Sequence, residues 1–136
     1  MEKITIHTSI NASLEEVWKR FTTPADIQNW NAASDDWHTT AASNELHVGG
    51  KFNWRMEAKD GSFGFDFWGI YDNIEPHKLI EYTLGDNRKV AVEFEYIGIG
   101  TRITETFEAE SENPIEMQRF GWQCILDNLK KYVEEN

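Results

Sequence analysis

Cysteine and basic residues are scarce in this chain, and long hydrophobic runs are absent. The single cysteine, Cys124, cannot form an internal disulfide, and no metal-type spacing of Cys and His surrounds it. No stretch approaches the roughly 18 apolar residues that a membrane span requires, and the N-terminus lacks the apolar segment of a secretory signal. These absences predict a cytoplasmic protein in a reducing compartment, with no membrane association.

Acidic residues outnumber basic residues in this chain. Thirteen Lys and Arg residues stand against 24 Asp and Glu residues, which gives a formal net charge of −11. Such a chain repels a phosphate backbone, so nucleic acid is excluded as a partner. The four histidines show neither H-x-H nor H-E-x-x-H spacing, and we therefore predict no metal site and no cofactor.

What the chain has in quantity is aromatic side chains. Aromatic residues make up 13% of 136 residues, including six Trp and eight Phe, and hydrophobic residues make up 40%. This composition excludes a disordered chain, and the length corresponds to about one domain. No internal repeat or linker interrupts the sequence, so we predict a single domain over residues 1–136.

Local patterns predict a strand followed by two short helices. Residues Lys3–Ser9 alternate between apolar and polar side chains, as in a strand with one buried face. Ser13 and Glu16 form a capping box that predicts a short helix. Thr23 and Pro24 provide a second cap and first-turn proline, which predict another helix of about two turns.

The remainder of the chain predicts an antiparallel sheet and one long helix. Between residues 36 and 110, turn residues separate segments with alternating polarity, as in successive hairpins: Lys51–Lys59, Phe63–Ile74, Leu79–Leu84, Lys89–Ile97 and Thr101–Ala109. Asn113 as the cap and Pro114 as the first helical residue then predict the start of a helix of about twenty residues. One face of the sheet is apolar, so we expect an α+β fold in which the long helix lies on the concave face of a curved sheet.

Four motifs, in this order, resemble the SRPBCC superfamily, and within it the branch named after the activator of heat-shock protein 90 ATPase. They are Val17-Trp18-x-x-Phe21-x-x-Pro24-x-x-Ile27-x-x-Trp30, Asp36-Trp37, Val48-Gly49-Gly50-x-Phe52 and Gly121-Trp122-x-x-x-Leu126-x-x-Leu129. The resemblance implies a helix-grip (START-like) fold, with a sheet of six to seven strands around the C-terminal helix. It also implies a cavity that binds a small hydrophobic ligand of the lipid, polyketide or flavonoid class.

Two other functions stay open beside ligand binding. The family name implies a protein-interaction module that regulates a chaperone ATPase, although the eukaryotic co-chaperone has a second domain for which this sequence has no room. An enzyme of the cyclase or hydrolase type, with Glu105 as the proton-transferring group, is the other alternative. The pattern favours a binding protein over an enzyme, and it is compatible with a monomer or a weak homodimer.

The candidate ligand-binding residues come from the apolar face of the sheet, from the long helix and from the early tryptophans. Any single ring is more often core than ligand contact, but a cavity lined by rings is typical of a small-molecule site. The set comprises Trp30, Trp37, Phe52, Trp54, Met56, Phe65, Phe67, Tyr82, Phe94, Glu105, Phe107, Met117, Phe120, Gly121 and Cys124. Within it, Trp37 is expected at the rim, and Gly121 either allows close approach of the helix to the sheet or leaves room for a ligand.

Glu105 is the anomaly in this set. It lies on the same side of its strand as Ile103 and Phe107, so strand periodicity points its carboxylate into the cavity. A β-bulge that turns it outward, or an ion pair with a nearby Lys or Arg, would remove the anomaly. Otherwise the carboxyl is a polar anchor for a ligand or an acid–base group with a raised pKa, because an unpaired buried carboxylate is costly.

Overall fold

Seven strands and three helices make up the fold, which is described from a computed structural model over residues 2–136. The elements follow the predicted succession of a strand, two short helices, a run of antiparallel strands and a long helix: β1 (Lys3–Ile10), α1 (Leu14–Thr22), α2 (Pro24–Trp30), β2 (Trp37–Asn44), β3 (Lys51–Ala58), β4 (Gly64–Glu75), β5 (Leu79–Leu84), β6 (Lys89–Tyr96), β7 (Thr101–Glu108) and α3 (Ile115–Glu135). The predicted α+β helix-grip architecture is confirmed.

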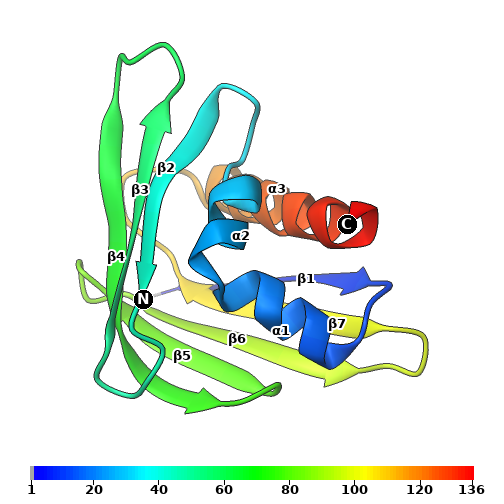
Figure 1. Ribbon diagram of the computed structural model, residues 1–136. Helices are drawn as coiled ribbons and strands as arrows, with labels where there is room; N and C mark the ends of the chain where they lie inside the picture. Colours follow the sequence, from blue (N-terminus) through cyan, green and yellow to red (C-terminus); the bar gives the residue numbers. More distant parts are fainter. Residues whose placement is uncertain (1) are drawn as a thin grey trace.

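All seven strands form one antiparallel sheet in the order β1-β7-β6-β5-β4-β3-β2. The sheet curls, so that β2, β3 and β4 stand away from the plane of β5, β6 and β7 (Figure 1). The strand register shifts in β2 between Thr39 and Ala41 and in β4 between Tyr71 and Asn73. Such irregularities bend a strand, and both lie in strands that stand away from the plane of β5, β6 and β7.

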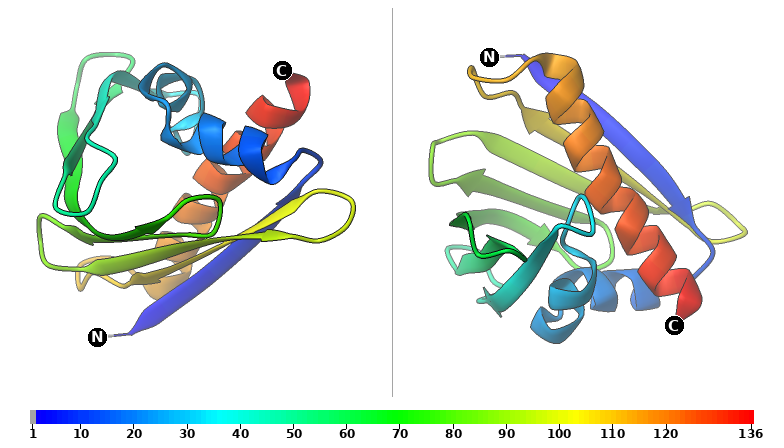
Figure 2. Two further views of the ribbon diagram at one scale, coloured as in Figure 1. Left: turned by 60° about the horizontal axis from the view of Figure 1, so that its bottom comes forward. Right: turned by 90° about the horizontal axis from the view of Figure 1, so that it is seen from above.

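The helices occupy the concave side of the sheet. Helix α3 crosses this side diagonally next to β1, while α1 and α2 lie beside its C-terminal half (Figure 2). Among residues 2–136, no helix combines the length and the apolar character needed to cross a bilayer.

The sequence signals for helix starts had different outcomes. Ser13 caps α1 as predicted, since its Oγ accepts a hydrogen bond of 3.1 Å from the backbone N–H of Glu16. The predicted cap at Asn113 is wrong, because Pro114 is the N-cap of α3 and provides no side-chain acceptor. The Asn113 amide group instead donates to Glu110, so it stabilises the turn before the helix.

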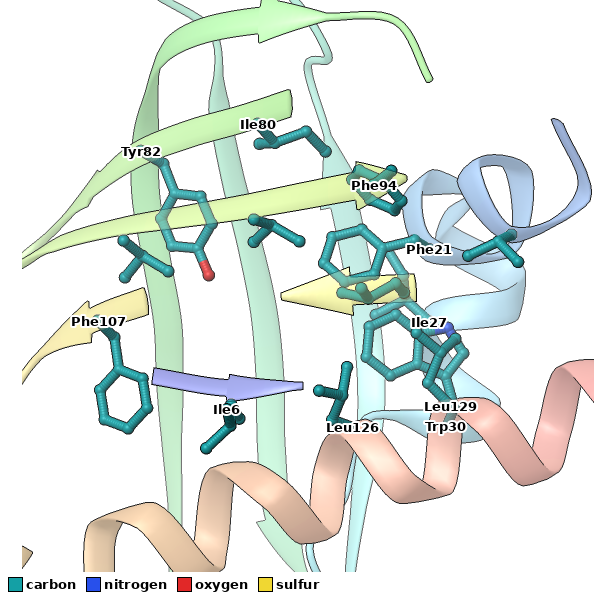
Figure 3. Packing of buried hydrophobic residues seen from close by; sticks show 14 of the residues in the cluster. Ile6, Phe21, Ile27, Trp30, Ile80, Tyr82, Phe94, Phe107, Leu126 and Leu129 are labelled. Atoms are coloured by element: carbon teal, nitrogen blue, oxygen red, sulfur yellow. The ribbon is translucent and has the colours of Figure 1, made fainter. Parts of the chain in front are cut away.

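The core lies between the sheet and α3. On β1, Ile4, Ile6 and Ile10 point inward with the alternation that the sequence predicts, and Phe107 on β7 and Val92 on β6 are buried as well. From α3, the fully buried contributions are Leu126 and Leu129, which face the sheet and α2 (Figure 3).

Candidate functional site

A cavity of about 240 Å³ lies between the sheet and the helices, and it is partly open to solvent. Its walls come from β3, β4, β5 and β7, from α1, α2 and α3, and from the segments that follow α2 and β5. Most of the lining side chains are aromatic: Phe21, Trp30, Trp54, Phe65, Phe67, Tyr82 and Trp122. Met56, Ile125, Asn31, Arg88 and Glu105 complete the lining. The site is therefore an apolar pocket with a few polar groups, the usual composition of a small-molecule site.

The aromatic wall is built from rings that contact one another across different elements. The Trp54 ring on β3 lies 6.0 Å from Trp30 of α2 and 5.7 Å from Phe67 of β4, between ring centroids. Phe67 in turn meets Trp122 of α3 at 6.1 Å. Trp122 stacks on Phe107 at 3.9 Å, nearly parallel. Each ring therefore packs against at least one other ring, which restricts the positions that it can take.

One polar atom in this wall lacks a partner. Nε1 of Trp54 is buried and has no hydrogen-bond acceptor among the described residues. A buried N–H without an acceptor is unfavourable in a folded protein.

Glu105 lies on the inner face of β7, as strand periodicity predicts. Its side chain is only 7% exposed, and its cross-strand neighbours Ile6 and Val92 are both buried and apolar. Strand β7 pairs in continuous register with β1 and β6, so no bulge turns the residue outward. Over residues 2–136, the Glu105 carboxyl forms neither an ion pair nor a hydrogen bond. Burial alone raises its pKa from 4.5 to about 8.

Tyr82 brings a second buried polar group to the cavity. Its hydroxyl points from β5 into the space between the sheet and α3 (Figure 3), and the residue is 4% exposed. Burial raises the pKa of this hydroxyl, and the nearby Glu105 carboxyl raises it further. At neutral pH the hydroxyl therefore keeps its proton, so it can donate as well as accept a hydrogen bond.

Arg88 supplies the cationic side chain of the lining, and two groups of its guanidinium have partners within the fold. Nε of Arg88 lies 2.8 Å from Oδ2 of Asp86, and one of its NH groups donates to the backbone carbonyl of Glu108 at 3.3 Å. Asn31 is similarly held, since its side-chain amide donates to Oγ1 of Thr39 at 3.1 Å. These two residues are fixed by the fold, whereas Glu105 is not engaged.

The structure brings many of the predicted site residues together. Those that line the cavity are Trp30, Trp54, Met56, Phe65, Phe67, Tyr82 and Glu105. A second group, Phe52, Phe94 and Phe107, is buried behind the lining and supports it. Phe52 packs against Tyr82 at 4.9 Å and Phe94 against Phe21 at 5.4 Å.

The remaining predicted residues lie elsewhere. Met117 and Phe120 are 60% and 71% exposed, because the first turns of α3 present those positions to solvent. Gly121 and Cys124 are half-buried and outside the lining. A Cβ at Gly121 would meet no atom within 4 Å, so close approach of the helix to the sheet is not the reason for this glycine. Trp37 also lies outside the lining, but its ring contacts Phe65 at 5.9 Å.

Sequence reasoning missed five lining residues, namely Phe21, Asn31, Arg88, Trp122 and Ile125. Trp122 and Ile125 point to the sheet together with Leu126 and Leu129. These residues are three or four positions apart, which places them on one helix face. This spacing is the only sequence signal for them, and it does not single them out, because Met117, Phe120 and Cys124 extend the apolar surface of α3 in other directions. Arg88 follows a turn, and no periodic signal indicates where its side chain lies.

Other polar clusters in the fold are structural. Arg20 ion-pairs with Glu16 at 2.7 Å and with Asp26 at 3.0 Å, and the Tyr132 hydroxyl donates to Asp26 at 2.6 Å. This network joins α1, α2 and α3. No group of three or more His, Cys, Asp or Glu side chains within the described chain is arranged to hold a metal ion.

Comparison with known proteins gives one family match. Residues 11–134 match the family model described as "Activator of Hsp90 ATPase homolog 1-like protein". No curated protein matches the chain.

Several solved structures share the fold over nearly the whole chain. The solution structure of an AHSA1-like protein from Aeromonas hydrophila has a TM-score of 0.93 and 45% identity, covering 98% of this chain and 93% of that one. A solution structure of a protein from Cytophaga hutchinsonii has a TM-score of 0.86 and 48% identity, with the same coverage. A crystal structure from Chromobacterium violaceum, at 22% identity and full coverage of both chains, has a TM-score of 0.89 and shows the fold alone.

Proposed function

The chain belongs to the family of activator of Hsp90 ATPase homolog 1-like proteins, and from this premise we propose that it binds a small hydrophobic molecule in the cavity between α3 and the sheet. The observation that carries the proposal is the cavity itself: a volume of about 240 Å³ lined mostly by aromatic rings, with an unengaged carboxyl inside. An engineered apolar cavity of about 150 Å³ is enough to bind benzene. A ligand with one ring or a small fused ring system therefore fits this volume.

The polar groups give the ligand an orientation. Glu105 and the Tyr82 hydroxyl both lie in the cavity, and neither is exposed by more than 7%. A ligand with one polar end gains by placing that end at these groups, because buried polar atoms are costly without partners. The apolar part of the ligand then contacts Trp54, Phe67 and Trp122.

Native mass spectrometry of the purified protein and a thermal-shift screen test this proposal. The screen covers molecules with one ring or a small fused ring system, and also the larger fatty acids, flavonoids, polyketides and sterols. A ligand at 100 times its Kd stabilises the folded state by about 2.7 kcal/mol, which raises the melting temperature by several degrees in a domain of this size. We expect at least one class to give such a shift.

A cavity-filling variant locates the binding site. Ile125→Phe adds volume to the lining and should abolish the shift, whereas Ile99→Phe makes the same change at a position that is 83% exposed and should leave it intact. If no class binds, or if Ile125→Phe binds as well as the unaltered protein, the cavity is not a ligand site.

A proton-transfer reaction in the same cavity is a second candidate, and one observation favours it. Burial raises the pKa of Glu105 to about 8, and a general acid or base is most effective when its pKa is near the working pH. The test is incubation of a ligand identified in the screen with the protein and with Glu105→Gln. Conversion of the ligand that is lost in the variant while binding persists supports an enzyme, and an unchanged ligand refutes it.

A further inference from the structure

The chemistry of the cavity's charged groups narrows the class of ligand. Two ionisable side chains with a formal charge line it, Glu105 and Arg88. The positive charge of Arg88 is already matched by Asp86 at 2.8 Å. Among residues 2–136, the carboxyl of Glu105 forms no ion pair with Arg88 or with any other basic side chain, and burial is the cause of its raised pKa. What the cavity lacks is therefore a positive charge beside Glu105.

The groups that face Glu105 are uncharged. From β1 and β6 its cross-strand neighbours are Ile6 and Val92, which carry no charge. From α3 the cavity receives Trp122 and Ile125, and from β5 the uncharged hydroxyl of Tyr82. Within residues 2–136, no element packed around this position brings a Lys or Arg into an ion pair with it. A cationic partner for the Glu105 carboxylate would therefore come from the ligand.

Aromatic rings make the same pocket favourable for a cation. The face of a Trp, Tyr or Phe ring attracts a positive charge, and the attraction strengthens when water is excluded. Trp30, Trp54, Phe67 and Trp122 line the cavity together with Glu105. The net charge of −11 adds a field that draws cations toward the protein and repels acids such as fatty acids.

We propose that the ligand is a protonated aromatic amine, whose ammonium pairs with the Glu105 carboxylate while its ring lies among the tryptophans of the cavity. This inference rests on the proposed binding function and specifies its ligand class. The volume of about 240 Å³ limits that class to one or two fused rings with a short side chain.

Binding of the amine releases a proton. In the empty cavity at neutral pH, the Glu105 carboxyl holds its proton, because burial raises its pKa to about 8. When the ammonium enters, the carboxyl proton passes to solvent and a carboxylate–ammonium pair remains. One proton is released for each amine bound, so affinity should rise about tenfold for each pH unit between pH 6 and 8 and level off above.

A matched series of indoles tests the inference by isothermal titration calorimetry. Tryptamine carries an ammonium, tryptophol replaces it with a hydroxyl, and indole-3-acetate carries a carboxylate on a similar ring. At pH 8 we expect tryptamine to bind at least tenfold more tightly than tryptophol, and indole-3-acetate to bind most weakly. Titrations of tryptamine at pH 7 in buffers of different ionisation enthalpy should show the released proton.

Two variants separate the local charge from the overall charge. Glu105→Gln keeps the shape of the side chain but cannot ionise, so the preference for tryptamine over tryptophol should disappear. Glu93→Gln removes one negative charge from the solvent-exposed side of β6, and the preference should remain. Circular dichroism confirms that both variants are folded.

The outcomes distinguish this inference from the broader function. If tryptophol binds as tightly as tryptamine, or if Glu105→Gln keeps the preference, the amine inference is wrong while ligand binding stands. If no member of the series binds but a neutral or acidic molecule from the thermal-shift screen does, the amine inference alone is again overturned. An empty screen together with an empty series overturns both.

Discussion

Replacement of Glu105 by glutamine should stabilise the protein, and the gain should grow with pH. The Glu105 side chain is 7% exposed, and burial raises its pKa from 4.5 to about 8. Glutamine has nearly the same shape and volume, can form similar hydrogen bonds and never ionises. The comparison of the two chains therefore isolates the cost of keeping an ionisable group at this position.

The direction of this pH dependence follows from the protonation of Glu105 in the folded chain and in the unfolded chain. Below pH 4.5 the carboxyl is protonated in both the folded and the unfolded chain, so the two proteins should differ little. Between pH 4.5 and 8 the unfolded chain loses this proton while the folded chain keeps it, which favours unfolding. The free energy of unfolding of the glutamate protein then falls, relative to the variant, by about 1.4 kcal/mol per pH unit, to a total of about 5 kcal/mol near pH 8.

Urea unfolding followed by tryptophan fluorescence at pH 5, 6, 7, 8 and 9 measures this difference. Glu93→Gln is the control: its side chain is solvated on the other side of the sheet, and its difference from the unaltered protein should not change over the range. A difference between Glu105→Gln and the unaltered protein that stays constant from pH 5 to pH 8 would refute the reasoning. It would mean that the carboxyl is ionised inside the folded protein, by a partner or by water.

Four substitutions, each measured by urea unfolding, test the packing of α3. Leu129→Ala should lower the free energy of unfolding by about 2–5 kcal/mol, because Leu129 is fully buried. Phe120→Ala should lower it by less than about 0.5 kcal/mol, because Phe120 is 71% exposed. A larger loss for Phe120→Ala than for Leu129→Ala would contradict the helix register. Gly121→Ala should raise it by up to about 1 kcal/mol, since a Cβ there meets no atom within 4 Å; a loss of stability would reveal a contact that the structure lacks. Tyr132→Phe removes the 2.6 Å hydrogen bond to Asp26 and should cost about 1 kcal/mol; an unchanged value would mean that Arg20 alone satisfies that carboxylate.

The sheet and the position of Glu105 could be predicted because strand periodicity is simple. In β7, the residues Thr101, Ile103, Glu105 and Phe107 alternate with solvated ones, and the pairing with β1 and β6 runs without a bulge. With a period of two and an unbroken register, each inward position follows from its neighbours. The inward orientation of Glu105 could therefore be predicted from the sequence alone.

The face of α3 that packs on the sheet could not be predicted in the same way. Apolar residues occupy most directions around this helix, so periodicity does not distinguish the exposed Phe120 from the cavity-lining Trp122. The stack of Trp122 on Phe107 at 3.9 Å joins the face to the sheet. A contact between residues from different elements leaves no local pattern in the sequence, and the same holds for Arg88, whose place follows from the turn after β5.

The cost of Glu105 is itself an argument about what the cavity is for. A core formed for stability alone would place an apolar side chain between Ile103 and Phe107, and a leucine there would avoid a penalty that grows with pH. The rings around it pack against one another, which limits how far they can close onto the carboxyl. Local violations of the packing rules in an otherwise consistent fold are typical of functional sites. An unengaged acid inside a preformed aromatic pocket therefore favours a binding site over a packing defect, and the ligand that best offsets the cost is one that brings the missing positive charge.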